Sequence, residues 1–329
     1  MKKVLATLAA VAAGGTLVAC GSAPESASTF TPQTLTAAGA TFPAPLYQRW
    51  FQDYAASGKH KVSYQAVGSG AGVRQFAAGT VDFGASDGAV KDSKIPASGL
   101  VHIPMTGGAI VPAYNNPGCD AKMTQTQLAD VFLGKITNWS TFGCADKGIK
   151  VVYRSDGSGT TQGFTNSLSA FSPEWKEKVG TGKAVTWKTG VGAKGNSGVA
   201  AQIKQMDGAI GYLNYGYVSG GKFQQVALEN KDGNYVLASA ETSAAGLSKI
   251  VLDDKLRGAD ANPSGENAYP IVSLTWILAY PEAPKNAAVK DTLRYMLSEE
   301  AQSKSDSLGY VPLPESLRQK ALAAVDTLR

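Results

Sequence analysis

The residues best suited to chemistry lie in one stretch, residues 153–164, which reads Tyr-Arg-Ser-Asp-Gly-Ser-Gly-Thr-Thr-Gln-Gly-Phe. The stretch follows the apolar pair Val151-Val152 and runs into a segment with helical spacing, so the pattern predicts a strand, a small-residue turn and the start of a helix. The first amides of a helix lack partners within it, and the helix dipole favours a negative charge there. The stretch therefore indicates an anion site, with an ordinary capped helix as the alternative.

Two charged residues flank this turn, and small residues follow them. Arg154 offers a planar fork of donors that suits phosphate or carboxylate. Asp156 is suited either to hold that fork in place or to cap the helix. Ser158 and Thr160 add hydroxyl donors, and Gly159 leaves its backbone amide uncovered.

Three further junctions between strands and turns carry donors or a carboxylate. Thr41 and Phe42 precede a segment with helical spacing, and Ser69 lies in a glycine-rich turn between a predicted strand and a predicted helix. Asp87 follows a strand that alternates apolar and polar residues. Because ligands bind outside the carboxyl ends of the strands in open α/β sheets, we expect the four junctions to converge on one ligand.

The composition predicts a soluble globular protein with two domains. The chain has 329 residues, of which 43% are hydrophobic and 17% are charged. Its formal net charge is +5, but Lys2 and Lys3 lie in a segment that we expect to be removed, which leaves 29 basic and 26 acidic residues, or +3. Such a small excess does not indicate a nucleic-acid partner.

The first 19 residues have the pattern of a signal peptide. Lys2 and Lys3 precede an apolar, alanine-rich run that is shorter than the roughly 20 residues of a membrane span. The run ends in Leu-Val-Ala-Cys, which resembles the bacterial lipobox, so Cys20 is expected to become the first mature residue and to carry lipid. Residues 20–33 read as a flexible tether. The expected product is exported and held by its acyl chains at the cell membrane, facing the periplasm or the exterior; a plain secreted protein is the alternative.

The remaining cysteines are expected to form a disulfide. Cys119 and Cys144 would lie in an oxidising compartment, where a disulfide is more common than a metal or redox pair. The chain has only two histidines, His60 and His102, and neither lies near a cysteine pair with ligand spacing. We therefore predict no metal and no cofactor.

Two motifs match enzyme signatures without the context that these need. Residues 84–88 read Gly-Ala-Ser-Asp-Gly and match G-x-S-x-G, but residues 89–96 do not form a convincing helix and only His102 follows as a base. Residues 190–195 match G-x-G-x-x-G but lack the carboxylate about 20 residues later. Neither a hydrolase nor a dinucleotide-binding enzyme is favoured.

The rest of the chain alternates strands and helices, with no internal repeat of fixed period. Two predicted helices at the C-terminus are amphipathic, one through Val289, Leu293 and Met296 and the last from Leu317 to Leu328. In the middle of the chain the pattern predicts helices at 126–133 and 199–206 and strands at 184–187 and 209–212, and the last part of the chain resumes with a predicted strand at 271–279.

Taken together, the motifs resemble a known family. The runs at residues 38–45, 81–87 and 154–160 closely resemble the phosphate-binding protein of bacterial ABC-type phosphate importers. Further runs agree at residues 131–139, 195–201 and 208–212. The resemblance extends from Leu35 to the last helix and rests on specific motifs.

The resemblance implies an α/β, two-lobed periplasmic-binding-protein fold of type II, with the ligand between the lobes. Lobe 1 would comprise residues 34–106 and 271–329, and lobe 2 residues 107–270. The two segments of the hinge would cross near Pro104 to Ala109 and Ala268 to Ser273. A monomer is expected.

The resemblance also implies the task and the site. The protein would bind inorganic phosphate, in its monohydrogen and dihydrogen forms, and deliver it to the permease and ATPase of an importer, without being an enzyme. Asp87 would accept a hydrogen bond from a ligand that still carries a proton and so exclude sulfate, and Asp156 would orient Arg154. The alternatives are a secreted phosphatase that uses Ser69 or Ser158, and a phosphate-sensing surface protein. The residues implied in phosphate binding are Thr41, Phe42, Ser69, Asp87, Arg154, Asp156, Ser158, Gly159 and Thr160.

Overall fold

The computed structural model describes residues 30–329. The predicted signal peptide, the lipidation of Cys20 and most of the tether lie outside the described residues. The helices and strands below all belong to the unit formed by residues 32–329.

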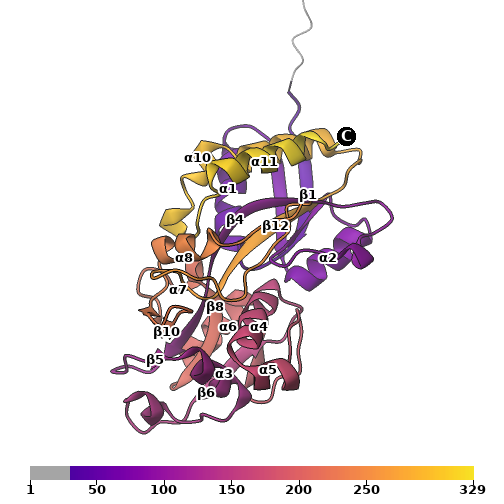
Figure 1. Ribbon diagram of the computed structural model, residues 1–329. Helices are drawn as coiled ribbons and strands as arrows, with labels where there is room; N and C mark the ends of the chain where they lie inside the picture. The colour runs from indigo at the N-terminus through magenta and orange to yellow at the C-terminus, as the bar shows by residue number, and fades with distance from the viewer. Residues whose placement is uncertain (1–29) are drawn as a thin grey trace, which may run out of the picture. The chain divides into compact units, whose positions relative to one another are not determined.

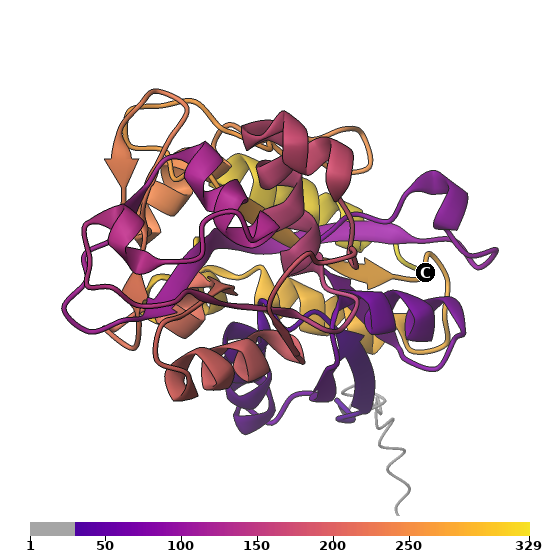
Figure 2. The ribbon, with the colours of Figure 1, turned by 90° about the horizontal axis from the view of Figure 1, so that it is seen from below.

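The long strand β4 (Val101–Asn115) connects the two parts of the main sheet. Its first part pairs antiparallel with β12 (Val272–Ala279), and from Ile110 onward it pairs antiparallel with β8 (Ala209–Asn214). Every residue of β4 between its two ends is buried, in keeping with a nearly continuous apolar run. Figure 2 shows β4 as one continuous ribbon through the unit. Its change of partner, between Ala109 and Ile110, falls at the edge of the predicted hinge segment.

Beyond β12, three strands extend the sheet in the order β3 (Phe83–Ser86), β1 (Thr34–Gly39) and β2 (Lys61–Ala66). Strand β1 is parallel to both of its neighbours. The crossover helices are α1 (Ala44–Ala56) after β1 and α2 (Ser69–Ala77) after β2. The predicted succession of strand, turn and helix is therefore confirmed twice here.

On the other side of β4 the sheet continues through β8 to β6 (Lys150–Arg154) and β7 (Val191–Ala193), which are parallel to each other. The short strand β9 (Gln224–Gln225) also pairs with β4. A separate sheet contains β5 (Lys122–Met123), β10 (Ala227–Glu229) and β11 (Tyr235–Val236). The helices of this region are α3 (Gln125–Leu133), α4 (Gly159–Phe171), α5 (Pro173–Lys178), α6 (Gly195–Gln205), α7 (Tyr215–Val218) and α8 (Ala240–Leu247).

The C-terminal helices return to the first part of the sheet. Helices α9 (Asn286–Met296), α10 (Glu299–Gln302) and α11 (Glu315–Asp326) follow β12. Figure 1 shows α10 and α11, in yellow, at the same end of the unit as the indigo helix α1, and the Trp50 indole of α1 donates a hydrogen bond to the Ala301 carbonyl of α10. This return is what a discontinuous first lobe requires, while the lobe boundaries themselves stay a prediction. Three 3₁₀ turns complete the described chain: Asp92–Lys94, Trp139–Phe142 and Asp306–Leu308.

The predicted strand at Ala184 to Trp187 is wrong. This segment is a loop, and β7 forms the edge of the sheet beside β6 instead. The apolar character that suggested a strand serves side-chain packing, because Trp187 stacks on Tyr153 and Tyr212 with ring centroids 5.1 and 5.7 Å apart. The other elements predicted in the middle and at the end of the chain are confirmed as α3, α6, β8, β12, α9 and α11.

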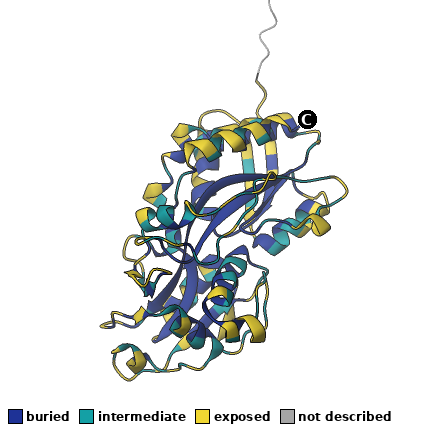
Figure 3. Ribbon diagram, viewed as in Figure 1, coloured by how far each residue is buried: buried dark blue, intermediate teal, exposed yellow. Residues whose placement is uncertain are grey.

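Large aromatic residues fill the core. Trp50, Trp139 and Trp276 are buried, and the central strands in Figure 3 are dark blue while the outward faces of the helices are yellow. A disulfide joins Cys119 to Cys144, with Cα atoms 5.2 Å apart, and ties the loop after β4 to the segment before β6. Within residues 30–329, no helix is both long and apolar enough to cross a membrane.

The contact between α2 and β1 gives a test of the packing. A Cβ atom on Gly72 would lie 2.4 Å from Gly39 Cα and 2.8 Å from the Ala38 carbonyl oxygen, which are backbone atoms that cannot rotate away. We expect Gly72→Ala to lower the free energy of unfolding by about 1 to 3 kcal/mol, despite the higher helix propensity of alanine. Urea unfolding measures the difference.

Gly148→Ala is the matched control, since a Cβ atom there would meet nothing within 4 Å. It should stay within about 0.5 kcal/mol of the wild type. Equal stabilities of the two variants would show that the helix and strand do not pack this closely.

Candidate functional site

The four junctions predicted from the sequence meet at the carboxyl ends of β1, β2, β3 and β6. Ser69 Oγ lies 3.3 Å from Asp87 Oδ2, and the Gly70 amide donates a hydrogen bond of 2.7 Å to the Gly157 carbonyl. A Cβ atom on Gly159 would lie 2.6 Å from both Asp87 Cβ and Ser69 Oγ, so only a glycine allows this approach. Except for the half-buried Asp156, all of the predicted site residues are buried: Thr41, Phe42, Ser69, Asp87, Arg154, Ser158, Gly159 and Thr160.

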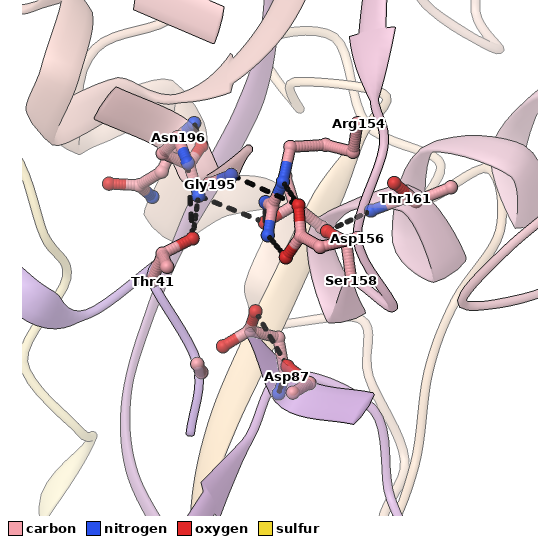
Figure 4. Close-up of polar contacts among 12 residues, drawn as sticks. Thr41, Asp87, Arg154, Asp156, Ser158, Thr161, Gly195 and Asn196 are labelled. Atoms are coloured by element: carbon pink, nitrogen blue, oxygen red, sulfur yellow. Dashed lines mark hydrogen bonds and ion pairs between the residues drawn. The ribbon is translucent and has the colours of Figure 1, made fainter. Parts of the chain in front are cut away.

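Arg154 and Asp156 form a bidentate ion pair. Arg154 Nε and Nη2 donate to the two carboxylate oxygens of Asp156 at 2.7 and 2.6 Å, and the Arg154 side chain is only 1% exposed. Of the two roles that the sequence left open for Asp156, the structure shows orientation of Arg154. The remaining nitrogen, Nη1, lies 3.4 Å from Thr160 Oγ1. Figure 4 shows the pair beside Thr41 and Asp87.

The surroundings keep Asp156 ionised. Burial alone would raise the pKa of Asp156, but the hydrogen bonds and charge of Arg154 and the Gly195 amide, which donates to Oδ1 at 3.0 Å, hold that pKa below its ordinary value. Asp156 is therefore ionised across the neutral pH range.

Helix α4 presents its N-terminus to the same place. Ser158 is the N-cap, and its Oγ accepts a hydrogen bond from the Thr161 amide at 3.0 Å. The preceding residues form a glycine-containing turn after β6, so the amides of the first turn, including those of Gly159 and Thr160, face the junction. The dipole of this 13-residue helix adds partial positive charge at the same point.

Asp87 is buried and titrates in an unusual range. Its Oδ1 accepts a hydrogen bond from Thr275 Oγ1 at 2.9 Å. Burial raises the pKa of Asp87 to about 6, although the Thr275 hydrogen bond and the charges of Arg154 and Lys183 oppose this rise. The ionised carboxylate is therefore destabilised by the loss of hydration. A hydrogen-bond donor placed against it would be strongly favoured.

Sequence reasoning missed Asn196, which links the two sides of the site. Asn196 Nδ2 donates to Thr41 Oγ1 at 2.9 Å and to Thr160 Oγ1 at 3.2 Å, and the Asn196 amide donates to Thr41 Oγ1 at 3.1 Å. Its own Oδ1 accepts from the Asn214 amide. The available signal was the position of Asn196 in the first turn of a helix after a glycine loop, within the run 195–201 that agrees with the family.

Three tyrosines that belong to no predicted site motif hold the Thr41 loop. The phenols of Tyr64, Tyr217 and Tyr310 donate to the successive carbonyl oxygens of residues 40, 41 and 42, at 2.6, 2.7 and 2.7 Å. Burial raises the pKa of all three phenols, so they remain donors. These contacts come from distant parts of the chain and fix the backbone that carries the amide of Phe42.

Open space borders the site on the side of Asp87. A cavity of about 380 Å³ is lined by Asp87, Arg257 and Gln162 among others, and a groove of about 620 Å³ is lined by Gln162 and Lys183 among others. In residues 30–329, no group of three His, Cys, Asp or Glu side chains could hold a metal ion. The arrangement offers many donors and few acceptors, which suits an anion.

Comparison with known proteins places the chain in a family. Residues 23–300 match the model of the PBP superfamily domain, so the chain is a member of this superfamily and the predicted fold is confirmed. It is 40% identical over 316 residues to the phosphate-binding protein PstS of Pasteurella multocida, covering 88% of this chain and 89% of the relative. With PstS of Haemophilus influenzae it is 38% identical over 297 residues, covering 85% and 89%. Within the superfamily, the chain therefore belongs to the PstS family of phosphate-binding proteins.

A solved structure agrees on the fold. The phosphate-binding protein from Stenotrophomonas maltophilia superimposes with a TM-score of 0.71 at 21% identity, covering 88% of this chain and 93% of that protein. At this identity the likeness supports the architecture and not the ligand.

The raised pKa of Asp87 predicts a pH-dependent stability. The folded state favours the protonated carboxyl, because the pKa is about 6 in place of the ordinary 3.8. This contribution to stability is fully present below about pH 4 and is lost as the pH rises through 6, for a total of about 2 to 3 kcal/mol. In phosphate-free buffer, Asp87→Asn should therefore gain stability relative to the wild type between pH 4 and pH 7.

Denaturant unfolding at pH 4, 5, 6 and 7 measures this difference. Asp254→Asn, at an exposed aspartate, serves as the control and should follow the wild type at every pH. A constant offset between Asp87→Asn and the wild type would mean that Asp87 titrates normally in the folded protein.

Proposed function

We propose that this protein binds inorganic phosphate with high affinity outside the cytoplasmic membrane and delivers it to the permease of an ABC importer. The observation that carries the proposal is the meeting of a buried, oriented guanidinium, a helix N-terminus and a buried carboxylate at one place. Relatives that share about 40% of its residues are named phosphate-binding proteins.

The hydroxyl groups of the site are arranged to donate. Thr41 Oγ1 accepts from Asn196, Thr160 Oγ1 from Arg154 and Asn196, and Ser158 Oγ from Thr161. Because protein N–H groups already occupy acceptor positions of each oxygen, each O–H group is left to donate to a ligand. Together with Arg154 Nη1 and the amides of Phe42 and Gly159, these groups suit an anion that is stripped of water.

Asp87 supplies the selectivity. A carboxylate only accepts hydrogen bonds, so it pairs with a ligand oxygen that still carries a proton. Monohydrogen and dihydrogen phosphate have such a proton, whereas sulfate is fully ionised and would meet Asp87 with repulsion between lone pairs. Recognition therefore depends on the protonation of the anion as well as on its shape.

The ligand favours closure of the two predicted lobes. Contacts already join them near the site, such as Asn196 with Thr41, the Gly70 amide with the Gly157 carbonyl, and the Tyr217 phenol with the Thr41 carbonyl. A phosphate that binds Thr41 on one side and Arg154 on the other would add to these contacts only in the closed form, so binding shifts the population toward closure. The permease would recognise the closed form. The monomer would be held at the membrane through lipid on Cys20.

The first test is isothermal titration of the mature, phosphate-stripped protein at neutral pH. Phosphate should bind one to one with a Kd of about 1 μM or tighter, equivalent to about 8 kcal/mol or more. Sulfate should give no heat of binding. Absence of phosphate binding, or equal affinity for the two anions, would reject the proposed function.

The second test concerns Asp87. We expect Asp87→Asn to weaken phosphate binding by about 10- to 100-fold, as for the loss of a charge-assisted hydrogen bond of about 1.5 to 3 kcal/mol. The variant should also lose much of the preference for phosphate over sulfate, because the repulsive carboxylate is gone. Competition titrations measure both effects, and Asp254→Asn should leave them unchanged. If Asp87→Asn discriminated as well as the wild type, the carboxylate would not be the selective group.

A further inference from the structure

Lys183 links two turns of the predicted site in a way that neither the motifs nor the family relation assigns. It lies in the loop between α5 and β7, within the second predicted lobe. Its Nζ donates to Ser86 Oγ at 2.9 Å and to the Gly88 carbonyl at 3.3 Å. Ser86 is the last residue of β3 and Gly88 follows it, both in the first predicted lobe, so the side chain spans from one lobe to the other.

The two acceptors of Lys183 enclose Asp87. Ser86 Oγ donates to the Gly88 carbonyl at 2.6 Å and accepts from the Gly88 amide at 3.2 Å, so these residues form a tight turn with Asp87 in its middle. The ammonium group of Lys183 binds both ends of this turn. Its position therefore helps to set the position of the Asp87 backbone.

The backbone of Lys183 contacts the other half of the site. The Lys183 carbonyl accepts a hydrogen bond of 2.8 Å from the amide of Ser158, the N-cap of α4. One residue therefore holds the anion-binding turn through its main chain and the Asp87 turn through its side chain. Among the described residues, no carboxylate lies within salt-bridge distance of Lys183, so its charge acts on Asp87 over a longer range.

We propose that Lys183 is a positioning residue that clamps the Asp87 turn to the α4 N-terminus when the lobes close, and so slows the release of phosphate. The proposal rests on the proposed function. The clamp, which consists of Lys183 Nζ, Ser86 Oγ and the Gly88 carbonyl, can form only when the two turns are adjacent. It therefore stabilises the closed form and leaves the approach of the ligand to the open form largely unaffected.

The decisive measurement is the rate of phosphate release by stopped flow. Lys183→Met keeps the aliphatic stem and removes the ammonium group. We expect its release rate constant to rise by about 5- to 30-fold and its association rate constant to change by less than about 3-fold, as is common for changes that act on a formed complex. Lys183→Arg, which restores a cation, should recover part of the loss.

Lys188→Met is the matched control, because Lys188 is exposed and lies in the same loop. Its release rate should equal that of the wild type. A double-mutant cycle of Lys183→Met with Ser86→Ala should be clearly non-additive in release rate, since both variants break the same contact. Additive effects, or release rates of Lys183→Met and Lys188→Met that match the wild type, would overturn the proposal.

A readout without ligand separates this proposal from the proposed function. Part of the ligand-free population is closed as well, so in phosphate-free buffer amide hydrogen exchange of a peptide covering residues 86–90 should be faster in Lys183→Met than in the wild type. If the wild type bound no phosphate, the proposed function would fail, and unchanged exchange would then overturn the clamp as well. Faster exchange combined with an unchanged phosphate release rate would make Lys183 a structural residue of the turn and overturn its role in release.

Discussion

The site depends on the ion pair between Arg154 and Asp156. A guanidinium with 1% exposure has lost nearly all its hydration, and only a well-placed partner offsets that cost. The Asp156 carboxylate accepts hydrogen bonds from two nitrogens of Arg154, and the third nitrogen, Nη1, is directed toward Thr160. The charge of Arg154 is balanced within the protein, so the site does not require an anion to be stable. Recognition of a ligand then rests on the direction of the donors more than on net charge.

The scaffold supplies this direction through contacts between distant segments. Strand β4 changes partner from β12 to β8, and so places the carboxyl ends of β1 and β3 opposite that of β6. The tyrosine phenols on the carbonyls of residues 40–42 then fix the Thr41 loop against both parts of the sheet. A loop whose carbonyls are all occupied has little freedom to turn its amides away from the site. Rigid backbone donors of this kind need no reorganisation when a ligand arrives.

The sequence predicted the local parts of this arrangement well and the long-range parts poorly. Strand, turn and helix patterns around Thr41, Ser69 and Arg154 depend on residues within about 15 positions, and the structure has them as predicted. The contact of Thr275 with Asp87 joins residues 188 positions apart, and no local pattern records it. The wrongly predicted strand that ends at Trp187 shows the opposite case, in which a local pattern is present but the element is not. Its apolar residues have the pattern of a strand, but Trp187 packs on neighbouring rings and the segment does not join the sheet. The convergence of the four junctions was predicted from the rule that ligands bind outside the carboxyl ends of the strands in open α/β sheets, and the family resemblance added the identity of the ligand.

The selectivity follows from a mismatch between the numbers of donors and acceptors in a buried place. The Thr41 and Thr160 hydroxyls each accept two protein hydrogen bonds, and backbone amides and Arg154 only donate, so Asp87 is the main acceptor left near the α4 N-terminus. An anion without a proton would satisfy the donors but would give this carboxylate no hydrogen bond, and it would bring a second negative charge beside it. An anion with one proton satisfies both the donors and the Asp87 carboxylate. Burial holds the pKa of Asp87 near 6, because the ionised carboxylate has lost hydration. A hydrogen bond from a protonated anion therefore stabilises this carboxylate more than it would stabilise an exposed one. This difference in binding free energy separates phosphate from sulfate, which is nearly the same size.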